Sequence, residues 1–139
     1  MAVFNKFSTF VADVGNGVHD LGSDVLKIML SNTAPDAEDA VLTDITEIGA
    51  GHGYDAGGVA VSDTAFAQTD GVAKLTGTDA VFTADGGTIG PFQYAVLYNS
   101  TAANGPLIGW WDYGTAITLA DTHTFTVHFD ETDGILTLQ

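Results

Sequence analysis

Histidine and serine are the residues of this sequence best suited to acid–base or nucleophilic chemistry. The four histidines, at positions 19, 52, 123 and 128, are the side chains that titrate near neutral pH. None stands in an HExxH pattern, and His123 and His128 are five residues apart, which puts them on opposite faces of a strand. No serine lies in a G-x-S-x-G elbow, and cysteine is absent. The sequence therefore predicts no catalytic nucleophile, no metal centre and no cofactor.

Acidic residues are abundant, but nothing in their spacing singles out a catalytic pair. Most are aspartates, and seven of the fifteen aspartates stand next to glycine or threonine, a placement typical of turns. The densest group, residues 130–134 (DETDG), lacks the alternation of an EF-hand loop. We interpret the acids as a solvated surface, with a weak calcium site as the alternative.

The glycine-rich stretch at residues 49–53 (GAGHG) superficially resembles a phosphate-binding loop. It lacks the Lys-Ser/Thr that would follow such a loop, and no helical pattern comes after it. We predict that it forms a flexible or tightly turned loop.

The most distinctive aromatic segment is residues 109–114 (GWWDYG). On a strand, Trp110 and Asp112 face one way, and Trp111 and Tyr113 face the other. One tryptophan is therefore predicted to be in the core. The other is either covered by the chain's own loops or is an anchor between subunits, and a sugar-binding platform is a third reading.

The first 22 residues differ in pattern from the rest. Apolar residues at positions 4, 7, 11, 14, 18 and 21 follow helical spacing, which predicts a helix from about residue 5 to 14. We divide the chain into an N-terminal arm or helix, residues 1–22, and a β-rich domain, residues 23–139. The arm is either an ordinary packing helix or a contact with a neighbouring subunit. The interface candidates are Phe4, Phe7, Phe10, Val11, Trp110, Trp111 and Tyr113.

Short apolar runs separated by turn residues dominate the remainder. Strands are expected at residues 25–30, 59–61, 65–68, 72–75, 80–82, 92–98, 107–113, 117–119, 124–129 and 135–138. The run at 92–98 is long enough for a central strand buried on both faces. This spacing predicts a mainly β protein, a single-domain β-sandwich or barrel with a short N-terminal helix.

Charge restricts the partners. The chain has 18 acidic residues against 3 basic ones, and all three are lysines, which gives a formal net charge of −15. Such a chain repels nucleic acid and anionic membranes, and it lacks arginine for clamping phosphate. We expect a partner that is neutral, basic or another copy of the chain, and no apolar run is long enough to span a membrane.

Several segments resemble a family of small virion proteins of siphophages. They are residues 24–35 (DVLKIMLSNTAP), 42–45, 53–58, 90–99 (GPFQYAVLYN), 106–114 (PLIGWWDYG), 124–127 and 134–138. The resemblance covers nearly the whole chain in order. It implies a structural or decoration protein made beside the major capsid protein, and it brings no catalytic residues with it.

The resulting hypothesis is a non-enzymatic capsid decoration (cement) protein. It would bind the major capsid protein on the outer surface of the virion as a homo-oligomer, with a trimer favoured, after synthesis in the bacterial cytoplasm. Deleting residues 1–10 would then abolish attachment and leave the β domain folded. The alternative is a tail component (tube, terminator or baseplate), against which the apparent shortness of the strands counts. An enzyme such as a glycosidase is a third class and would need paired buried carboxylates.

Overall fold

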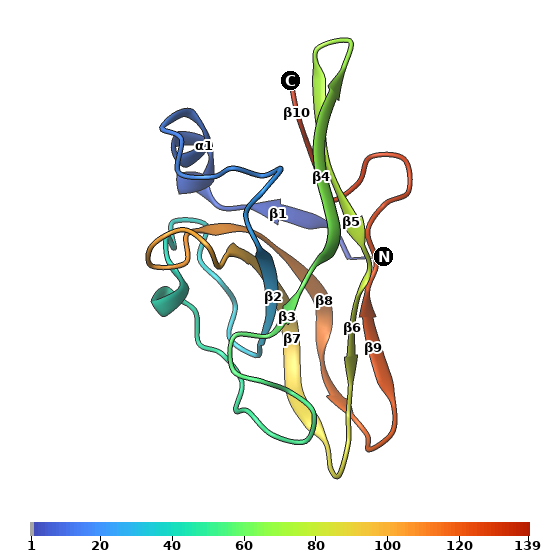
Figure 1. Cartoon of the computed structure of the whole chain (residues 1–139). Coiled ribbons are helices and arrows are strands. Elements are labelled where there is room, and N and C mark those ends of the chain that lie inside the picture. Colours follow the sequence, from blue (N-terminus) through green and yellow to red (C-terminus); the bar gives the residue numbers. More distant parts are fainter. Residues whose placement is uncertain (1) are drawn as a thin grey trace.

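The computed structural model describes residues 2–139, and its strands form three antiparallel sheets (Figure 1). The sheet orders are β1-β8-β7-β2-β3, β10-β5-β4 and β6-β9. The elements are β1 (Phe4–Lys6), α1 (Ser8–Gly15), β2 (Leu26–Ser31), the 3-10 helix η1 (Leu42–Asp44), β3 (Val59–Ala60), β4 (Ser62–Thr69), β5 (Val72–Thr78), β6 (Ala80–Thr83), β7 (Ile89–Asn99), β8 (Leu107–Leu119), β9 (Thr124–Val127) and β10 (Leu136–Leu138). The predicted fold class, mainly β with one short helix near the N-terminus, is confirmed.

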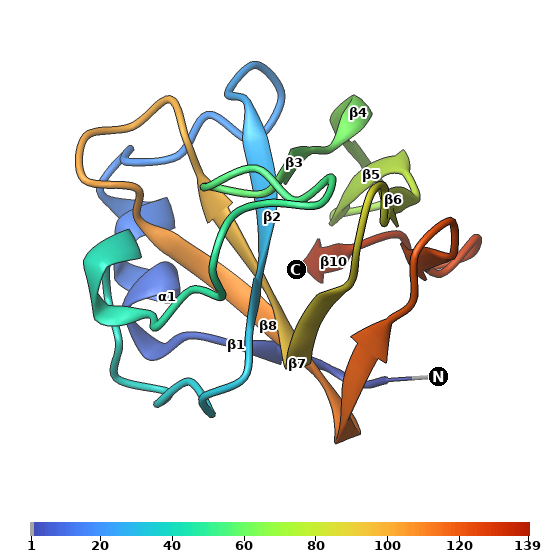
Figure 2. The ribbon, with the colours of Figure 1, turned by 90° about the horizontal axis from the view of Figure 1, so that it is seen from below.

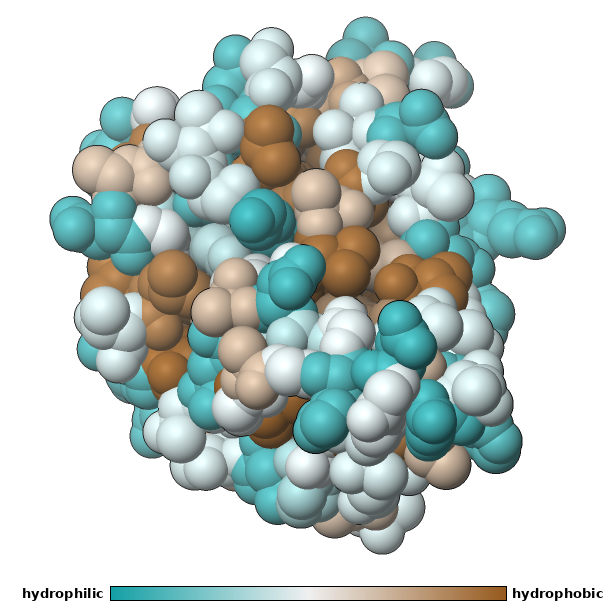
Figure 3. Space-filling view, turned by 60° about the horizontal axis from the view of Figure 1, so that its bottom comes forward, coloured by the Kyte–Doolittle hydropathy of each residue, from teal (hydrophilic) through white to brown (hydrophobic). Residues whose placement is uncertain are grey.

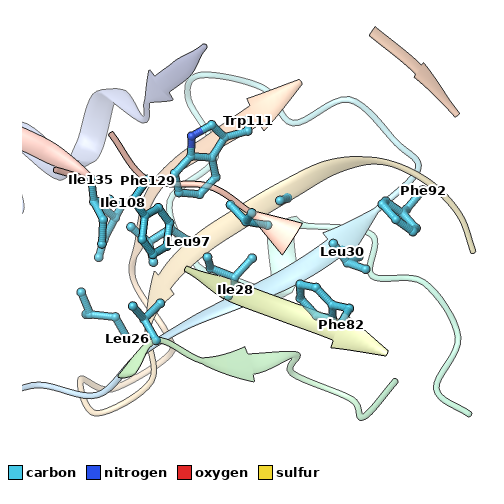
Figure 4. Close-up of a cluster of buried hydrophobic side chains, with 14 of the residues drawn as sticks. Leu26, Ile28, Leu30, Phe82, Phe92, Leu97, Ile108, Trp111, Phe129 and Ile135 are labelled. Atoms are coloured by element: carbon cyan, nitrogen blue, oxygen red, sulfur yellow. The ribbon is translucent and has the colours of Figure 1, made fainter. Parts of the chain in front are cut away.

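Both faces of the five-stranded sheet are covered. Seen from below, the sheet lies between the segment that carries η1 and the two smaller sheets (Figure 2). Ile28 and Leu97 point into the main core, which the smaller sheets complete (Figure 4). Met29 and Val96 point the other way, into a second cluster with Ile45. The apolar run of β7 is therefore buried on both faces from Ala95 to Asn99, as its composition predicts.

The N-terminal segment belongs to the body of the protein. Residues 4–6 form a strand and the helix begins only at Ser8, so the predicted helix is wrong in its first turn. Phe4 pairs with Trp111 and Lys6 with Gly109. The Phe4 ring lies where a side chain at position 109 would stand, so the glycine makes room for β1. Pairing with β8 satisfies backbone groups that the first turn of a helix would leave free.

Strand β8 is longer than expected. The sequence suggests two pieces separated at Gly114, whereas a single strand of 13 residues runs through that glycine, whose φ is +81°. Its partner β7 has 11 residues. The sequence-based argument that the strands are short is therefore wrong for the central pair. Conversely, β9 ends at Val127, two residues before its predicted end.

Strands β4 and β5 form a long hairpin that projects beyond the rest of the molecule (Figure 1). Asp70 and Gly71 make its two-residue turn with φ of 53° and 84°. Positive φ at both positions is the requirement of a type I′ turn, which Asp-Gly satisfies at low cost. Gln68 also accepts the Gly71 N–H at 3.0 Å through its side-chain oxygen.

The glycine-rich stretch continues to Gly57 and Gly58, and this glycine-rich loop, residues 49–58, is tightly turned. The hydroxyl of buried Tyr54 donates to Glu47 (2.7 Å) and accepts the backbone N–H of Leu30 (3.0 Å). Burial raises the pKa of this hydroxyl well above its usual value. Glu47 also accepts the N–H of Gly57 at 2.6 Å. These bonds tie the loop to β2, so it is a docked element of the fold.

Candidate interaction surface

The two tryptophans lie on opposite faces of the five-stranded sheet, as their alternation predicts. Trp111 is 5% exposed and contacts Phe4 and Phe129, with ring centroids 5.2 and 5.8 Å away. Trp110 is half-buried and lies 4.6 Å from the ring of Phe7 on the other face. Trp111 is thus the core residue, and Trp110 keeps part of its surface open.

Tyr113 closes one side of a surface pocket. Its ring packs edge-on against Phe125 at 4.9 Å, and burial raises the pKa of its hydroxyl to about 12. The pocket has a volume of about 450 Å³. It is lined by Ala2, residues 111–114, Thr126 and His128. The lining combines the aromatic residues Trp111 and Tyr113 with polar residues, which suits an amphipathic side chain of a partner.

The seven interface candidates separate into core and surface residues. Phe7, Phe10 and Trp111 are buried among the chain's own side chains, so they do not form a surface in this structure. Phe4, Trp110 and Tyr113 are half-buried, and Val11 is 58% exposed. They do not form one continuous patch. On the face in Figure 3, apolar side chains likewise appear as separate patches between hydrophilic ones.

The acidic residues lie at the surface with little compensation. No Asp or Glu among residues 2–139 is buried, and the one contact of salt-bridge length in that part of the chain is between Nδ1 of His128 and the carboxylate of Asp79, 2.8 Å apart. The chain therefore presents negative charge to solvent over much of its surface. This charge favours a neutral or basic partner and repels polyanions.

The acidic cluster at residues 130–134 folds into its own turn. One carboxylate oxygen of Asp130 accepts the backbone N–H groups of Thr132 and Asp133, both at 2.7 Å. These two bonds lower the pKa of Asp130. The structure brings no three potential metal ligands together in the part of the chain that it describes.

The histidines are dispersed, and His19 alone is in a partly buried network. Asn99, fully buried, donates to Asp24 (2.6 Å) and faces Nδ1 of His19 at 3.0 Å. The side-chain oxygen of Asn99, Oδ1, accepts the backbone N–H groups of Thr101 and Ala102. Since the Asn99 amide nitrogen can only donate, Nδ1 of His19 must accept, and the imidazole is neutral. Asn99 therefore has a structural role: its hydrogen bonds connect the end of β7 to Asp24, His19 and the loop that follows the strand.

We predict that His19 makes the protein less stable in mild acid. Desolvation lowers the pKa of His19 below 6.5, although Asp13 and Asp24 oppose the shift. A lowered folded-state pKa means that the unfolded chain binds the proton more tightly. Stability then falls as the pH drops from about 7 through the unfolded value of about 6.5, by at most about 1.4 kcal/mol per pH unit.

Denaturant titrations of the wild type and of His19→Gln between pH 7.5 and 5 measure this effect. The variant should lose less stability than the wild type over that range. His123→Gln, which changes an exposed histidine, is the matched control and should follow the wild type. The carboxylates with lowered pKa, such as Asp44, titrate below this window. Parallel curves for all three proteins would contradict the assignment.

The edge of β4 is a candidate surface that the sequence interpretation missed. It runs along the projecting hairpin and is hydrogen-bonded on one side only, to β5. The signal was present as Asp70-Gly71 between two runs of strand-forming residues, a pattern typical of a tight hairpin. That signal predicts the hairpin but not which of its edges stays open.

Comparison with protein-family models, curated proteins and solved structures gave no match. Within residues 2–139, no helix has the length and apolar character needed to cross a membrane.

Proposed function

We propose that the chain is a non-enzymatic structural protein of a tailed-phage virion, a decoration protein on the outer surface of the capsid. It binds the major capsid protein shell and stabilises it as a homo-oligomer, with a trimer matching a three-fold site. The observation that carries the proposal is the uncompensated acidic surface on a β-rich body. The family resemblance of the sequence points the same way.

The charge favours the outer side of the shell. Packaged DNA is a dense polyanion, and binding to it depends on Lys and Arg that displace counterions. This chain has three lysines and a formal net charge of −15. A protein of this charge can bind a neutral or basic outer surface, whereas the DNA inside the shell repels it. Many weak contacts across many copies then add through avidity.

Apart from Val3 and Val18, which are 73% and 36% exposed, the apolar part of the N-terminal segment that can reach a partner is the exposed face of α1. Val11 projects from it with 58% of its surface exposed, whereas Phe7 and Phe10 are turned inward. We assign Val11 to the shell contact. Trp110 and Tyr113 offer further half-buried aromatic surface.

Counting and locating the protein in purified particles tests the proposal. Quantitative mass spectrometry should find hundreds of copies per virion, and cryo-electron microscopy should place them outside the shell. Adding the full chain to heads that lack it should restore occupancy and raise the temperature at which the heads lose DNA. Absence from virions, or a location inside the shell, would rule the proposal out.

Val11→Asp should weaken attachment to such heads about tenfold without unfolding the chain. A carboxylate buried against the shell is desolvated without a partner, which costs well over 1 kcal/mol at an interface. Val81→Asp is the matched control, because Val81 is 46% exposed on β6. A binding assay at several protein concentrations measures both. Equal affinity of the two variants would exclude Val11 from the contact.

A tail component is the second candidate, and two observations favour it. A tube protein needs long strands and a hairpin that contacts its neighbour in a ring, and this chain has the 13-residue β8 and the projecting β4–β5 hairpin. Copy number separates the two functions. Six copies, or a multiple of six, located on the tail would establish the tail component.

Paired carboxylates of a glycosidase would have to be sought at the surface, since no acid among residues 2–139 is buried.

A further inference from the structure

Strand β4 is the longest of the strands that end a sheet. It has 8 residues, whereas the other edge strands have 2 to 4. Monomeric proteins protect such edges with lysine, proline, bulges or shortness. Between Ser62 and Thr69 there is no lysine or proline, and the one irregularity, at Asp63, lies at the end nearest the body.

A further open edge, on β8, is less suited to pairing. Beyond Trp111, β8 has β7 on one side and, among residues 2–139, no strand on the other. That stretch carries a charged residue, Asp112, and bends at Gly114, where φ is +81°. Its register against β7 also shifts. The outer half of β4 has none of these interruptions.

The hairpin geometry shows which backbone groups of β4 are free. In a two-residue hairpin the residues that flank the turn, here Thr69 and Val72, form a hydrogen-bonded pair. Hydrogen-bonded and non-bonded pairs alternate along an antiparallel ladder. Ala67 therefore bonds to β5, and the N–H and C=O groups of Phe66 and Gln68 point away from β5.

The charge along this edge favours a second copy of the chain as its partner. The chain carries a formal charge of −15, yet residues 64–69 (TAFAQT) are all neutral. A surface formed by these residues can meet an identical surface without facing acid with acid. Exposed Ala65 and Ala67 on one side of the strand are small enough for two copies to approach closely.

We propose that β4 pairs antiparallel with β4 of a second copy, centred on Ala67. In this register Ala67 faces its own counterpart, and Phe66 lies opposite Gln68 of the second copy, where their free backbone groups bond. Asp63 and Asp70 fall opposite Gly71 and Thr64, so no two carboxylates meet. The two three-stranded sheets become one continuous sheet across a two-fold axis.

This contact concerns the free protein and is independent of the proposed virion function. It links chains in pairs, and it can join trimers on a shell as well as single chains. Failure to find the protein in virions would leave it standing, and a monomeric protein in solution would leave the virion assignment standing.

Sedimentation velocity of the full chain over a range of concentrations tests the pairing. The wild type should form dimers at micromolar concentration. Ala67→Lys places two ammonium groups opposite each other and should raise the dimer dissociation constant at least tenfold. Ala116→Lys is the matched control, because Ala116 is an exposed alanine on the open stretch of β8. It should leave the constant unchanged.

A cysteine cross-link tests the register. The chain has no cysteine, so Ala67→Cys introduces a single thiol. Facing residues of a non-hydrogen-bonded pair have Cα atoms about 4.5 Å apart, within disulfide range. Under mild oxidation this variant should form an intermolecular disulfide at least tenfold faster than Ala116→Cys.

Each other result overturns the pairing. A wild type that stays monomeric, an Ala67→Lys variant as dimeric as Ala116→Lys, or equal cross-linking rates of the two cysteine variants would each do so. An oligomer insensitive to position 67 would mean that a different surface joins the copies. Circular dichroism checks that Ala67→Lys is folded, and if it is not, the cross-linking rates decide.

Discussion

Replacing Phe10 with alanine is expected to lower the free energy of unfolding by about 3–5 kcal/mol. Phe10 is 1% exposed, belongs to the main core and lies 5.3 Å from the ring of His19. Removing the buried benzyl group loses the free energy gained by burying it. It also leaves a cavity that the surrounding core cannot fill without moving. Since domains of this size are stable by about 5–15 kcal/mol, the loss is a large share of the total.

Chemical denaturation of Phe10→Ala beside Val11→Ala makes the comparison. Val11 is the next residue along α1 but is 58% exposed, so its truncation should change stability by about 0.5 kcal/mol or less. Equal, small losses in both variants would mean that α1 is a loosely attached arm. The pair also separates stability from binding: a contact of α1 with a partner is tested at Val11, not at Phe10.

The burial of Phe7 and Phe10 also changes what a deletion of the N-terminal residues is expected to do. Removing residues 1–10 takes away β1 as well as the buried rings of Phe7 and Phe10. Two such losses of about 3–5 kcal/mol each approach or exceed the whole stability of a domain. The truncated chain should be insoluble or unfolded, so loss of attachment by that variant would carry no information about the interface.

Local patterns predicted the strands of the core well. The apolar runs of β2 and β7 and the alternation of Trp110 and Trp111 follow from the two-residue period of a strand alone. The prediction failed where the same residues fit both a helical and a strand period. Phe4, Phe7 and Val11 match a helical face, and what places Phe4 in a strand is Gly109, a residue more than a hundred positions away. No local pattern contains that pairing.

The candidate surface was less predictable than the core, because exposure depends on what covers each face. The two-residue period of β8 predicts that the side chains of Trp110 and Trp111 point to opposite faces of the sheet. It does not say that Phe4 and Phe129 cover Trp111, whereas Trp110 has Phe7 against only part of its surface. Likewise, the Asp70-Gly71 turn predicts a hairpin, but the open edge of β4 follows only from the strand order. Glycine misled in β8, since Gly114 bends the strand without ending it.

Replacing Gly58 with alanine is expected to destabilise the protein by about 4 kcal/mol or more. Gly58 has a φ of +80°, which disfavours any residue with a Cβ. The added methyl group would also collide with the backbone carbonyl of Ile28 in the middle of β2. Because β2 is hydrogen-bonded to β7 on one side and to β3 on the other, this carbonyl cannot move away without breaking the sheet.

Gly49→Ala, in the same glycine-rich segment, is the matched control. A methyl group at Gly49 meets no atom within 4 Å, and the backbone there does not require glycine. That variant should be as stable as the wild type or gain up to about 1 kcal/mol, since it restricts the unfolded chain. Thermal and urea denaturation measure both variants, and equal stability of the two would show that the loop is not docked on β2.

The contrast also decides what the glycines of this loop do. A phosphate-binding loop needs backbone N–H groups that are free to reach a ligand. Here the N–H of Gly51 bonds to Tyr54, that of Gly57 to Glu47 and that of Gly58 to Asp55. Gly58 is required because the chain there passes against the backbone of β2, and a large loss of stability in Gly58→Ala with none in Gly49→Ala is the expected signature of that packing role.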